Sequence, residues 1–387
     1  SSTKNPKIRP GVIRFNIGWE FFFSFTCGSL FEKLYLSFSA APNHLFLPSP
    51  PESFTIHISV HHATILKECS MSLDDFNPSQ QTVLVIGAAG LDIVGRPSQM
   101  PEFGASVPAE VRPSFGGVAR NIAENLARLG QPVSLITVVG KDTFGQQLLE
   151  YTAQAGVDTS ACLRSSRLTT AAYLAVLTEQ SRLHFALDDM RVLSELTSAY
   201  LRQQEHHFAS AGLIFVDANL SPAALRTVFS LARKHKVPVC ADATSSVLAA
   251  KLKPYLSQLF MVTANPYEAA ILSGASSAPE DPEAAQKVAR NLIGLGAEIA
   301  VLPIAAFGVC YASSETSGHI PAIRTAILDP TGAGDALTAS VIFGLLNRIS
   351  LDEATRLGVS AASLTLRHPG TVYPDLSLEI LYDQLVI

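Results

Sequence analysis

Asp329-Pro330-Thr331-Gly332-Ala333-Gly334-Asp335 runs directly into the apolar segment Ala336 to Leu346, which predicts a glycine turn at the start of a buried helix. Small residues leave this backbone open to a bulky anion, which the free N–H groups and the positive dipole of a helix start attract. Asp335 would repel a phosphate, so we interpret it as a base that takes a proton from an attacking hydroxyl. The stretch predicts phosphoryl transfer to an alcohol, and an ordinary helix entry remains an equal alternative.

The composition limits the class of protein. The chain has 387 residues, of which 48% are hydrophobic and 16% charged, enough for one large α/β domain with additional sequence. Its net charge of −5 gives no basic surface for nucleic acid. No run approaches the roughly 18 apolar residues that span a membrane. The five cysteines are scattered without a C-x-x-C pair, so we expect no disulfide or zinc site and a reducing, cytoplasmic location.

Residues 1–80 differ from the rest of the chain. They follow neither a helical nor a strand period and contain the run Phe21-Phe22-Phe23-Ser24-Phe25. Two interpretations compete: a targeting leader, which would send the protein to an organelle, or sequence upstream of a true start at Met71. Glu20 and Glu32 weaken the first. We expect a disordered or poorly packed extension at 1–80, followed by one catalytic domain at 81–387.

From residue 82 onward, short apolar strands alternate with amphipathic helices. Val83 to Ile86 and Leu213 to Asp217 are typical buried strands, and Gly116 to Leu129 shows helical spacing. Such alternation predicts a three-layer α/β fold, with a mostly parallel central sheet and helices on both faces. Val133 to Val139 is predicted as one further strand. Ligands should collect at the carboxyl ends of these strands.

Two segments interrupt this alternation. Residues 96–115 are rich in proline, and residues 169–187 resemble a hairpin with a polar turn at 179–181. We expect them to form a small β lid that covers a substrate and through which two copies of the chain could pair as a homodimer. Thr170 and Tyr173 in this lid are candidates for substrate contacts.

Two glycine elements occur early in the domain. Gly87-Ala88-Ala89-Gly90 follows a strand, but Pro97 comes too soon for the helix that a dinucleotide site requires. We interpret Asp92, expected at the carboxyl end of that first strand, either as a ligand of two sugar hydroxyls or as a turn cap. The pair Gly116-Gly117 opens a helix and allows a ligand to approach, or forms a tight loop. Asn121 lies one turn further among apolar neighbours, where its amide can donate and accept.

The element Gly116-Gly117…Asn121 and the element Thr331 to Asp335 together resemble the two signatures of the ribokinase-like (PfkB) carbohydrate and nucleoside kinases. The run Gly116 to Gly130 is most similar to the same run in pseudouridine kinases. The resemblance covers about residues 82–387 and implies a ribokinase-like fold, with phosphorylation of the ribose 5′-hydroxyl of pseudouridine by ATP and Mg²⁺. A kinase for another nucleoside or sugar is the first alternative. A nucleoside- or sugar-binding protein with impaired catalysis is the second.

The resemblance also implies a role for each matching position. Asp335 would be the catalytic base, and the N–H groups of Gly332, Ala333 and Gly334 would form the anion hole. The substrate would be bound by Asp92, Gly116, Gly117 and Asn121, ATP and Mg²⁺ by Asn265, Glu268 and Gly308, and a monovalent cation such as K⁺ by Asp329 and Thr331.

The chain departs from the family pattern at two places that bear on activity. Gly90 stands where the family usually has an asparagine ahead of the first-strand acid. The loop Pro303-Ile304-Ala305-Ala306-Phe307-Gly308 retains only Gly308 of the customary glycines. Because Ala305 and Ala306 would crowd the phosphates of a nucleotide, these departures predict a slow enzyme or an altered phosphoryl donor.

Overall fold

The computed structural model describes two short strands near the N-terminus and residues 81–385, apart from 100, 101, 103 and 179–182. The chain divides into two compact units, Ser1–Glu68 and Cys69–Ile387. In the first unit, β1 (Phe23–Cys27) pairs antiparallel with β2 (Leu30–Leu34). The rest of the expected extension at 1–80 lies outside the described residues, so its character stays a prediction.

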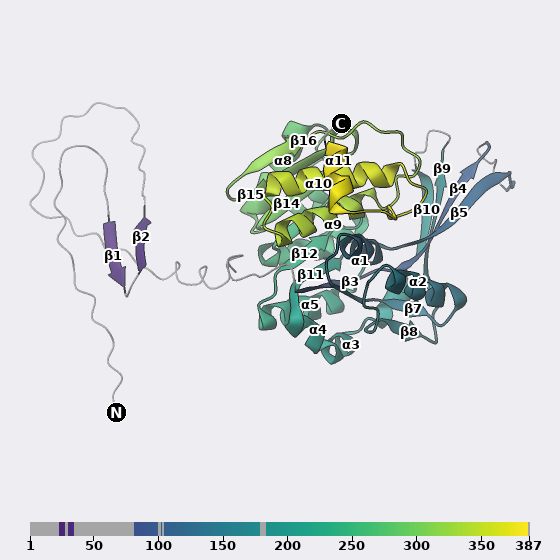
Figure 1. Ribbon diagram of the computed structural model, residues 1–387, viewed down its shortest axis with the longest axis horizontal. Helices are drawn as coiled ribbons and strands as arrows, with labels where there is room; N and C mark the ends of the chain where they lie inside the picture. The colour runs from purple at the N-terminus through teal and green to yellow at the C-terminus, as the bar shows by residue number, and fades with distance from the viewer. Residues whose placement is uncertain are drawn as a thin grey trace, which may run out of the picture. The chain divides into compact units, whose positions relative to one another are not determined.

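The second unit is built on an eight-stranded sheet with the order β16-β15-β14-β13-β12-β11-β3-β6 (Figure 1). Its strands are β3 (Thr82–Ile86), β6 (Val133–Ile136), β11 (Ala211–Asp217), β12 (Val239–Asp242), β13 (Met261–Thr263), β14 (Ile299–Pro303), β15 (Val309–Ser313) and β16 (Ser317–Ile320). The strands from β6 to β14 run parallel, and β15 and β16 add an antiparallel edge. The predicted mostly parallel sheet is therefore confirmed, and its antiparallel edge makes it a mixed sheet.

Helices cover both faces of this sheet. The α-helices are α1 (Val118–Arg128), α2 (Thr143–Gln154), α3 (Ser198–Gln203), α4 (Glu205–Ser210), α5 (Pro222–His235), α6 (Ser246–Ala249), α7 (Pro266–Ser273), α8 (Pro282–Gly294), α9 (Ala333–Leu346), α10 (Leu351–Leu366) and α11 (Leu378–Leu385). The 3₁₀ helices are η3 (Arg191–Glu195), η4 (Ala250–Gln258) and η5 (Ala305–Phe307). Alternate strand residues point to opposite sides. Val83 and Val85 pack in the core with α1, α9 and α10, whereas Leu84 and Ile86 pack in the core with α5 and α8.

The helices α2, α3, α5, α7, α8 and α10 start at a capping side chain, whereas α1, α4, α6 and α9 do not. Ser221 accepts a hydrogen bond from the Ala224 N–H at 3.1 Å, and Pro222 follows it at the start of α5. At α9 no side chain caps the helix. Its start is set by Gly332, which has a φ of 79°. The first N–H groups of α9 are therefore left without a side-chain acceptor.

A second sheet of four strands forms a small lid, with the order β10-β9-β4-β5. Its strands are β4 (Gly90–Pro97), β5 (Ala109–Gly116), β9 (Ala171–Leu177) and β10 (Leu183–Asp189). Figure 1 shows these strands projecting from one side of the main sheet and its helices. The two predicted lid segments thus supply three of its strands, and the predicted polar turn lies outside the described residues.

Two predicted positions were wrong. The stretch 133–139 is not one strand, because β6 ends at Ile136 and β7 (Val138–Gly140) pairs with β8 (Leu163–Ser165) in a separate small sheet. Asp92 does not end the first strand, because β3 stops at Ile86 and Asp92 lies inside β4 of the lid. The strand conformation is interrupted between β3 and β4 at Gly87, where a Cβ would lie 2.1 Å from the Asp217 carboxylate.

None of the helices among the described residues is long and apolar enough to cross a membrane.

Candidate active site

The two glycine elements meet at the carboxyl edge of the main sheet. Asn121 comes from α1, and Asp335 from the first turn of α9. The Nδ2 atom of Asn121 donates a hydrogen bond to Oδ2 of Asp335 at 2.6 Å, across 214 residues of sequence. Asn121 is only 2% exposed, whereas Asp335 is partly exposed, so this bond lies at the border between the core and solvent. The early and late elements therefore form a single polar site.

The glycine turn has both a tight side and an open side. A Cβ on Gly332 would lie 1.9 Å from the carbonyl oxygen of Thr371, so only glycine fits there. At Gly334, by contrast, a Cβ would meet no heavy atom within 4 Å. No side chain caps the first N–H groups of α9, and uncapped N–H groups at a helix start attract anions.

The environment of Asp335 raises the pKa of its carboxyl group. Burial raises the pKa of Asp335 to about 7, although the hydrogen bond from Asn121 and the positive charge of Arg120 act in the opposite direction. The negative charges of Asp92 and Asp217 add to the rise. A carboxyl group with such a pKa can accept a proton from a hydroxyl and later release it.

Asp92 lies close to this site in β4 and is 6% exposed. Its carboxylate occupies the space beside Gly116, where a Cβ would lie 2.0 Å from Oδ2. Gly117 has a φ of 94° and would, with a Cβ, collide with the backbone of Ala88 at 2.6 Å. The glycine pair is therefore needed for packing. Burial raises the pKa of Asp92 to about 7, and the charge of Arg120 opposes that rise.

Asn265 and Glu268 are joined in a capping box at the start of α7. Oδ1 of Asn265 accepts from the Glu268 N–H at 3.1 Å, and Oε2 of Glu268 accepts from the Asn265 N–H at 2.8 Å. Burial raises the pKa of Glu268. Burial also raises the pKa of Asp242, at the end of β12, and the negative charges of Glu268 and Asp335 raise it further. Asp242 thus links this pair electrostatically to the glycine turn.

The remaining predicted site residues have local partners. A Cβ on Gly308, which has a φ of 100°, would lie 2.1 Å from the Ile320 carbonyl oxygen, so packing against β16 requires glycine there. Ala305 in the same loop is exposed and has a φ of 50°. Buried Asp329 accepts a hydrogen bond from the Thr331 N–H at 2.9 Å. These contacts stabilise the loop at 303–308 and the turn at 329–332. They do not involve a ligand, so the binding roles of these residues remain proposals.

The pfkB family carbohydrate kinase model matches residues 80–377 of the chain. The chain belongs to the PfkB family. The pseudouridine kinase of Escherichia coli K12 is 34% identical over 298 residues, which cover 76% of this chain and 94% of that protein. The ribokinase of Arabidopsis thaliana complexed with ribose and ATP superposes with a TM-score of 0.70 at 19% identity, covering 79% of this chain and 99% of that one. A candidate ribokinase II of E. coli in complex with ATP and Mg²⁺ gives a TM-score of 0.69 at 16% identity, with the same coverage of 79% and 99%.

These comparisons confirm the predicted ribokinase-like fold and the expectation of an enzyme. As a PfkB kinase, the chain is a phosphotransferase that acts on a sugar hydroxyl. The two ribokinase structures share the fold with this chain, and what they bind is a property of those proteins. The acceptor and the role of each site residue in this PfkB kinase are considered below.

Sequence reasoning missed several polar groups of this PfkB kinase. Asp217 and Asp242 each end a parallel strand, and an acid directly after a buried apolar run was the available signal. Arg120 and Glu124 are 1% and 0% exposed, and their spacing of four residues on the buried face of α1 was the signal for a buried pair. Thr371 carried no such signal, because it follows α10 in an irregular loop.

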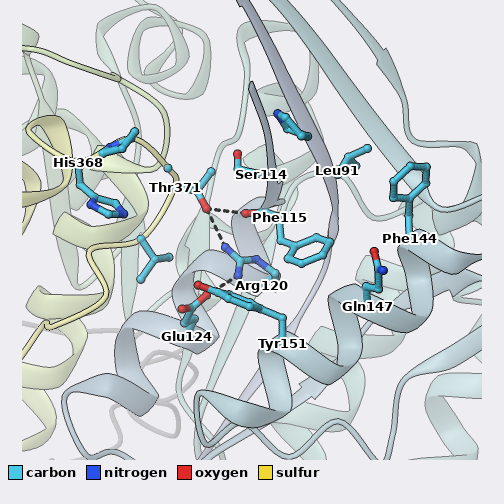
Figure 2. Close-up of a pocket in the computed structure, with 14 residues that line it drawn as sticks. Leu91, Ser114, Phe115, Arg120, Glu124, Phe144, Gln147, Tyr151, His368 and Thr371 are labelled. Carbon is cyan, nitrogen blue, oxygen red and sulfur yellow. Dashed lines mark hydrogen bonds and ion pairs between the residues drawn. The ribbon is translucent and has the colours of Figure 1, made fainter. Parts of the chain in front are cut away.

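A cavity of about 310 Å³ is lined by three of these missed residues, Arg120, Glu124 and Thr371. Figure 2 shows the Arg120 side chain between Glu124 and Thr371. The lining residues are Leu91, Pro113, Ser114, Phe115, Arg120, Glu124, Phe144, Gln147, Tyr151, His368, Pro369, Gly370, Thr371 and Val372. The cavity therefore borders the lid, α1, α2 and the loop that follows α10.

Proposed function

We propose that this PfkB kinase transfers the terminal phosphoryl group of ATP to the ribose 5′-hydroxyl of pseudouridine. The observation that carries the proposal is the 2.6 Å hydrogen bond between Asn121 and Asp335. This bond joins the buried amide of Asn121, a group that can bind sugar hydroxyls, to the Asp335 carboxylate at the uncapped start of α9. Similarity to the E. coli pseudouridine kinase supports pseudouridine over other acceptors.

On the acceptor side, Asp92, Asn121 and the backbone at Gly116 and Gly117 would hold the ribose hydroxyls. Asp92 pairs in register with Tyr173 of β9, so both side chains lie on the same face of the lid. The Tyr173 ring is half-buried and offers a flat apolar surface to a base.

Thr170 is a weaker candidate for a substrate contact. Its hydroxyl donates to Oδ1 of Asp142 at 2.7 Å and accepts from the Gly140 N–H at 3.0 Å. It is also 8% exposed. We therefore assign Thr170 a structural role and retain Tyr173 as the base contact.

In the reaction, Asp335 would take the proton from the 5′-hydroxyl as that oxygen attacks the γ-phosphorus. The bond from phosphorus to the bridging oxygen breaks, and its electron pair leaves with ADP. The N–H groups of Gly332, Ala333 and Gly334 would stabilise the charge on the transferred group. This role agrees with the open space beside Gly334.

The residues near Glu268 fit a magnesium site. Mg²⁺ prefers oxygen ligands and usually takes one or two carboxylates together with phosphate and water. Asp242 ends β12, and Glu268 lies in the first turn of α7, which follows the neighbouring strand β13. The pKa of Asp242 is raised by burial and by nearby negative charge, which a cation would offset. Asn265 would hold Glu268 in place through the capping box. When bound, Mg²⁺ would neutralise charge on the phosphates.

The other donor-side roles rest on the family resemblance. Gly308 would let the loop at 303–308 lie over the nucleotide. Asp329 and Thr331 would bind K⁺ next to the glycine turn, where buried Asp329 supplies carboxylate oxygens.

The test compares acceptors under one set of conditions. The protein is incubated with ATP, Mg²⁺ and either pseudouridine, uridine, guanosine, inosine or ribose, and ADP release is measured. We expect pseudouridine to give the highest kcat/KM, with its isomer uridine as the closest control. A higher kcat/KM for ribose or for another nucleoside would replace pseudouridine as the acceptor and leave the kinase assignment in place.

We also propose that two copies pair through the lid. The face of the lid opposite Asp92 exposes the apolar side chains Val111, Leu174, Phe185 and Leu187, by 38–64%. Leu174 and Leu187 pair directly across β9 and β10, so this surface is continuous. Sedimentation should give a dimer, which Leu187→Asp converts to a monomer. Leu295→Asp, at an exposed leucine in the main domain, is the control and should leave the dimer intact.

The cytoplasm is the compartment that we propose. Cys162, Cys240 and Cys310 are free thiols. Burial raises the pKa of all three, so they stay protonated and unreactive near neutral pH. Free thiols of this kind are typical of a reducing compartment.

A further inference from the structure

We propose that Arg120 is a positioning residue, which holds the Asn121 amide so that its NH₂ group faces Asp335. The inference rests on the proposed function, in which Asp335 is the base. It assigns a role to a residue that has none in the proposed function.

Arg120 is the hub of a buried network. It is 1% exposed and forms an ion pair with Glu124, one turn further along α1. One of its nitrogens, Nη2, donates both to Oδ1 of Asn121 and to Oγ1 of Thr371, the latter at 2.8 Å. Thr371 in turn donates to the Phe115 carbonyl oxygen at 2.6 Å. Figure 2 shows the Arg120 guanidinium between Glu124 and Thr371.

The chemistry of the guanidinium fixes which way the Asn121 amide points. An arginine side chain has only donors, so the group facing it must be the amide oxygen. The opposite end of the amide is then the NH₂ group, which donates to Asp335. If the amide were reversed, its oxygen would face the carboxylate and repel it. Arg120 therefore selects the orientation that favours an ionised Asp335.

The same network holds the loop after α10 against the glycine turn. Thr371 receives the Arg120 hydrogen bond through its hydroxyl, while its carbonyl oxygen packs on the Cα of Gly332. A shift of the Arg120 side chain would therefore affect two walls of the site, the Asn121 amide and the start of α9.

Several charged groups face Asp335, and their combined effect determines its pKa. They are Asp92 from β4, Arg120 from α1, Asp217 from β11 and Asp242 from β12. Arg120 is the cation among them, and it lowers the pKa values of both Asp92 and Asp335 against the effect of burial. Removing its charge should therefore protonate the base at pH values where the parent enzyme is active.

The experiment separates charge from orientation with two variants. Arg120→Met/Glu124→Gln removes the fully buried pair as a unit. It leaves Arg128, the other partner of Glu124, which is partly exposed and also donates to the Pro374 carbonyl oxygen. Arg120→Lys keeps the charge but lacks the forked donor group. The control is Arg128→Met, because Arg128 also pairs with Glu124, at 2.6 Å, but contributes no hydrogen bond to Asn121. Folding of each variant is checked by thermal unfolding.

Two readouts are compared: the pKa of Asp335, from ¹³C-carboxyl NMR assigned with Asp335→Asn, and the dependence of kcat on pH. In the double variant we expect the pKa of Asp335 to rise by about one unit, and the acid limb of the kcat profile to move to higher pH by the same amount. At pH 7 the fraction of ionised Asp335 would then fall about fivefold. In Arg120→Lys the limb should stay in place while the plateau kcat falls about tenfold. Arg128→Met should change neither.

The inference is overturned if Asp335 in the folded double variant titrates as in the parent. It is also overturned if Arg120→Lys keeps the parent plateau, or if Arg128→Met shifts the limb as much as the double variant does. Failure of the proposed function looks different, since the parent would then phosphorylate no acceptor. The NMR titration still decides the role of Arg120 in that case.

Discussion

The acceptor side and the donor side of the site are built in different ways. On the acceptor side, the polar contacts join distant parts of the chain, as Asn121 does with Asp335 across 214 residues and Arg120 with Thr371 across 251. On the donor side, Asn265 and Glu268 are three residues apart and bond to each other. Long-range bonds would fix the proposed base relative to a bound sugar, whereas a local cap fixes only the start of its own helix.

This difference has a consequence for function. Proton transfer requires the base to lie within hydrogen-bond reach of the hydroxyl, so its position must be set by several elements together. A metal that keeps most of its water shell tolerates a looser arrangement. We therefore expect substitutions on the acceptor side to affect kcat most, and those on the donor side to affect the use of MgATP.

The largest expected effect tests the acceptor side. Asp335→Asn keeps the shape of the side chain and can still accept from Asn121, but it cannot take a proton. We expect kcat to fall by about 10²–10⁴ with nucleoside binding retained, as measured by steady-state kinetics and calorimetric titration. Asp375→Asn, at an exposed aspartate, is the control. Near-normal turnover by Asp335→Asn would remove this residue from the role of base.

The pH dependence of the parent enzyme follows from the same group. Because Asp335 must be ionised to act as a base, kcat should fall as the pH drops below about 7, the raised pKa of this carboxyl. Asp92 has a similarly raised pKa, so the two acids are expected to titrate as a coupled pair. A kcat that stays constant down to pH 5 would contradict this assignment.

The second effect tests whether Glu268 is more than a helix cap. Glu268→Gln can still accept from the Asn265 N–H, so the stability of α7 should change little. The charge that would attract Mg²⁺ is lost, and we expect kcat/KM for MgATP to fall about tenfold, or about 1.4 kcal/mol. Raised Mg²⁺ should restore part of the rate. If kinetics at limiting and at saturating Mg²⁺ both match the parent, Glu268 acts only as a cap.

Features set by local sequence patterns could be predicted, whereas features set by contacts between distant segments could not. The alternation of strands and helices, the glycine turn at Gly332 and the helix that carries Asn121 were all predicted from local patterns. The position of Asp92 was not, because the break at Gly87 depends on contact with distant Asp217. Nor was the role of Arg120, whose partner Thr371 lies 251 residues away in an irregular loop. Pairing between distant segments leaves no local period to detect.

A third and smaller effect concerns stability on the acceptor side. The folded-state pKa of Asp335 is raised above its ordinary value of 3.8, so this group favours the folded state at acid pH and the contribution is lost as the pH rises through about 7. Asp335→Asn lacks this dependence. At pH 8 we expect the variant to be more stable than the parent, as measured by thermal unfolding. At pH 5 the difference should shrink, and a constant difference between pH 5 and pH 8 would contradict the raised pKa.

The smallest expected effect tests the loop at 303–308 on the donor side. Ala305 is exposed and holds a left-handed φ of 50°, which costs a residue with a Cβ about 1–2 kcal/mol. Ala305→Gly relieves that strain and removes a methyl group from the side where ATP is proposed to bind. We expect KM for ATP to fall about threefold, or about 0.6 kcal/mol, while KM for the nucleoside is unchanged. The long-range bonds that position the acceptor side do not involve this loop, so the KM for the nucleoside should not respond to Ala305→Gly. An equal change in both KM values would show that the two sides are coupled and would contradict the difference between them.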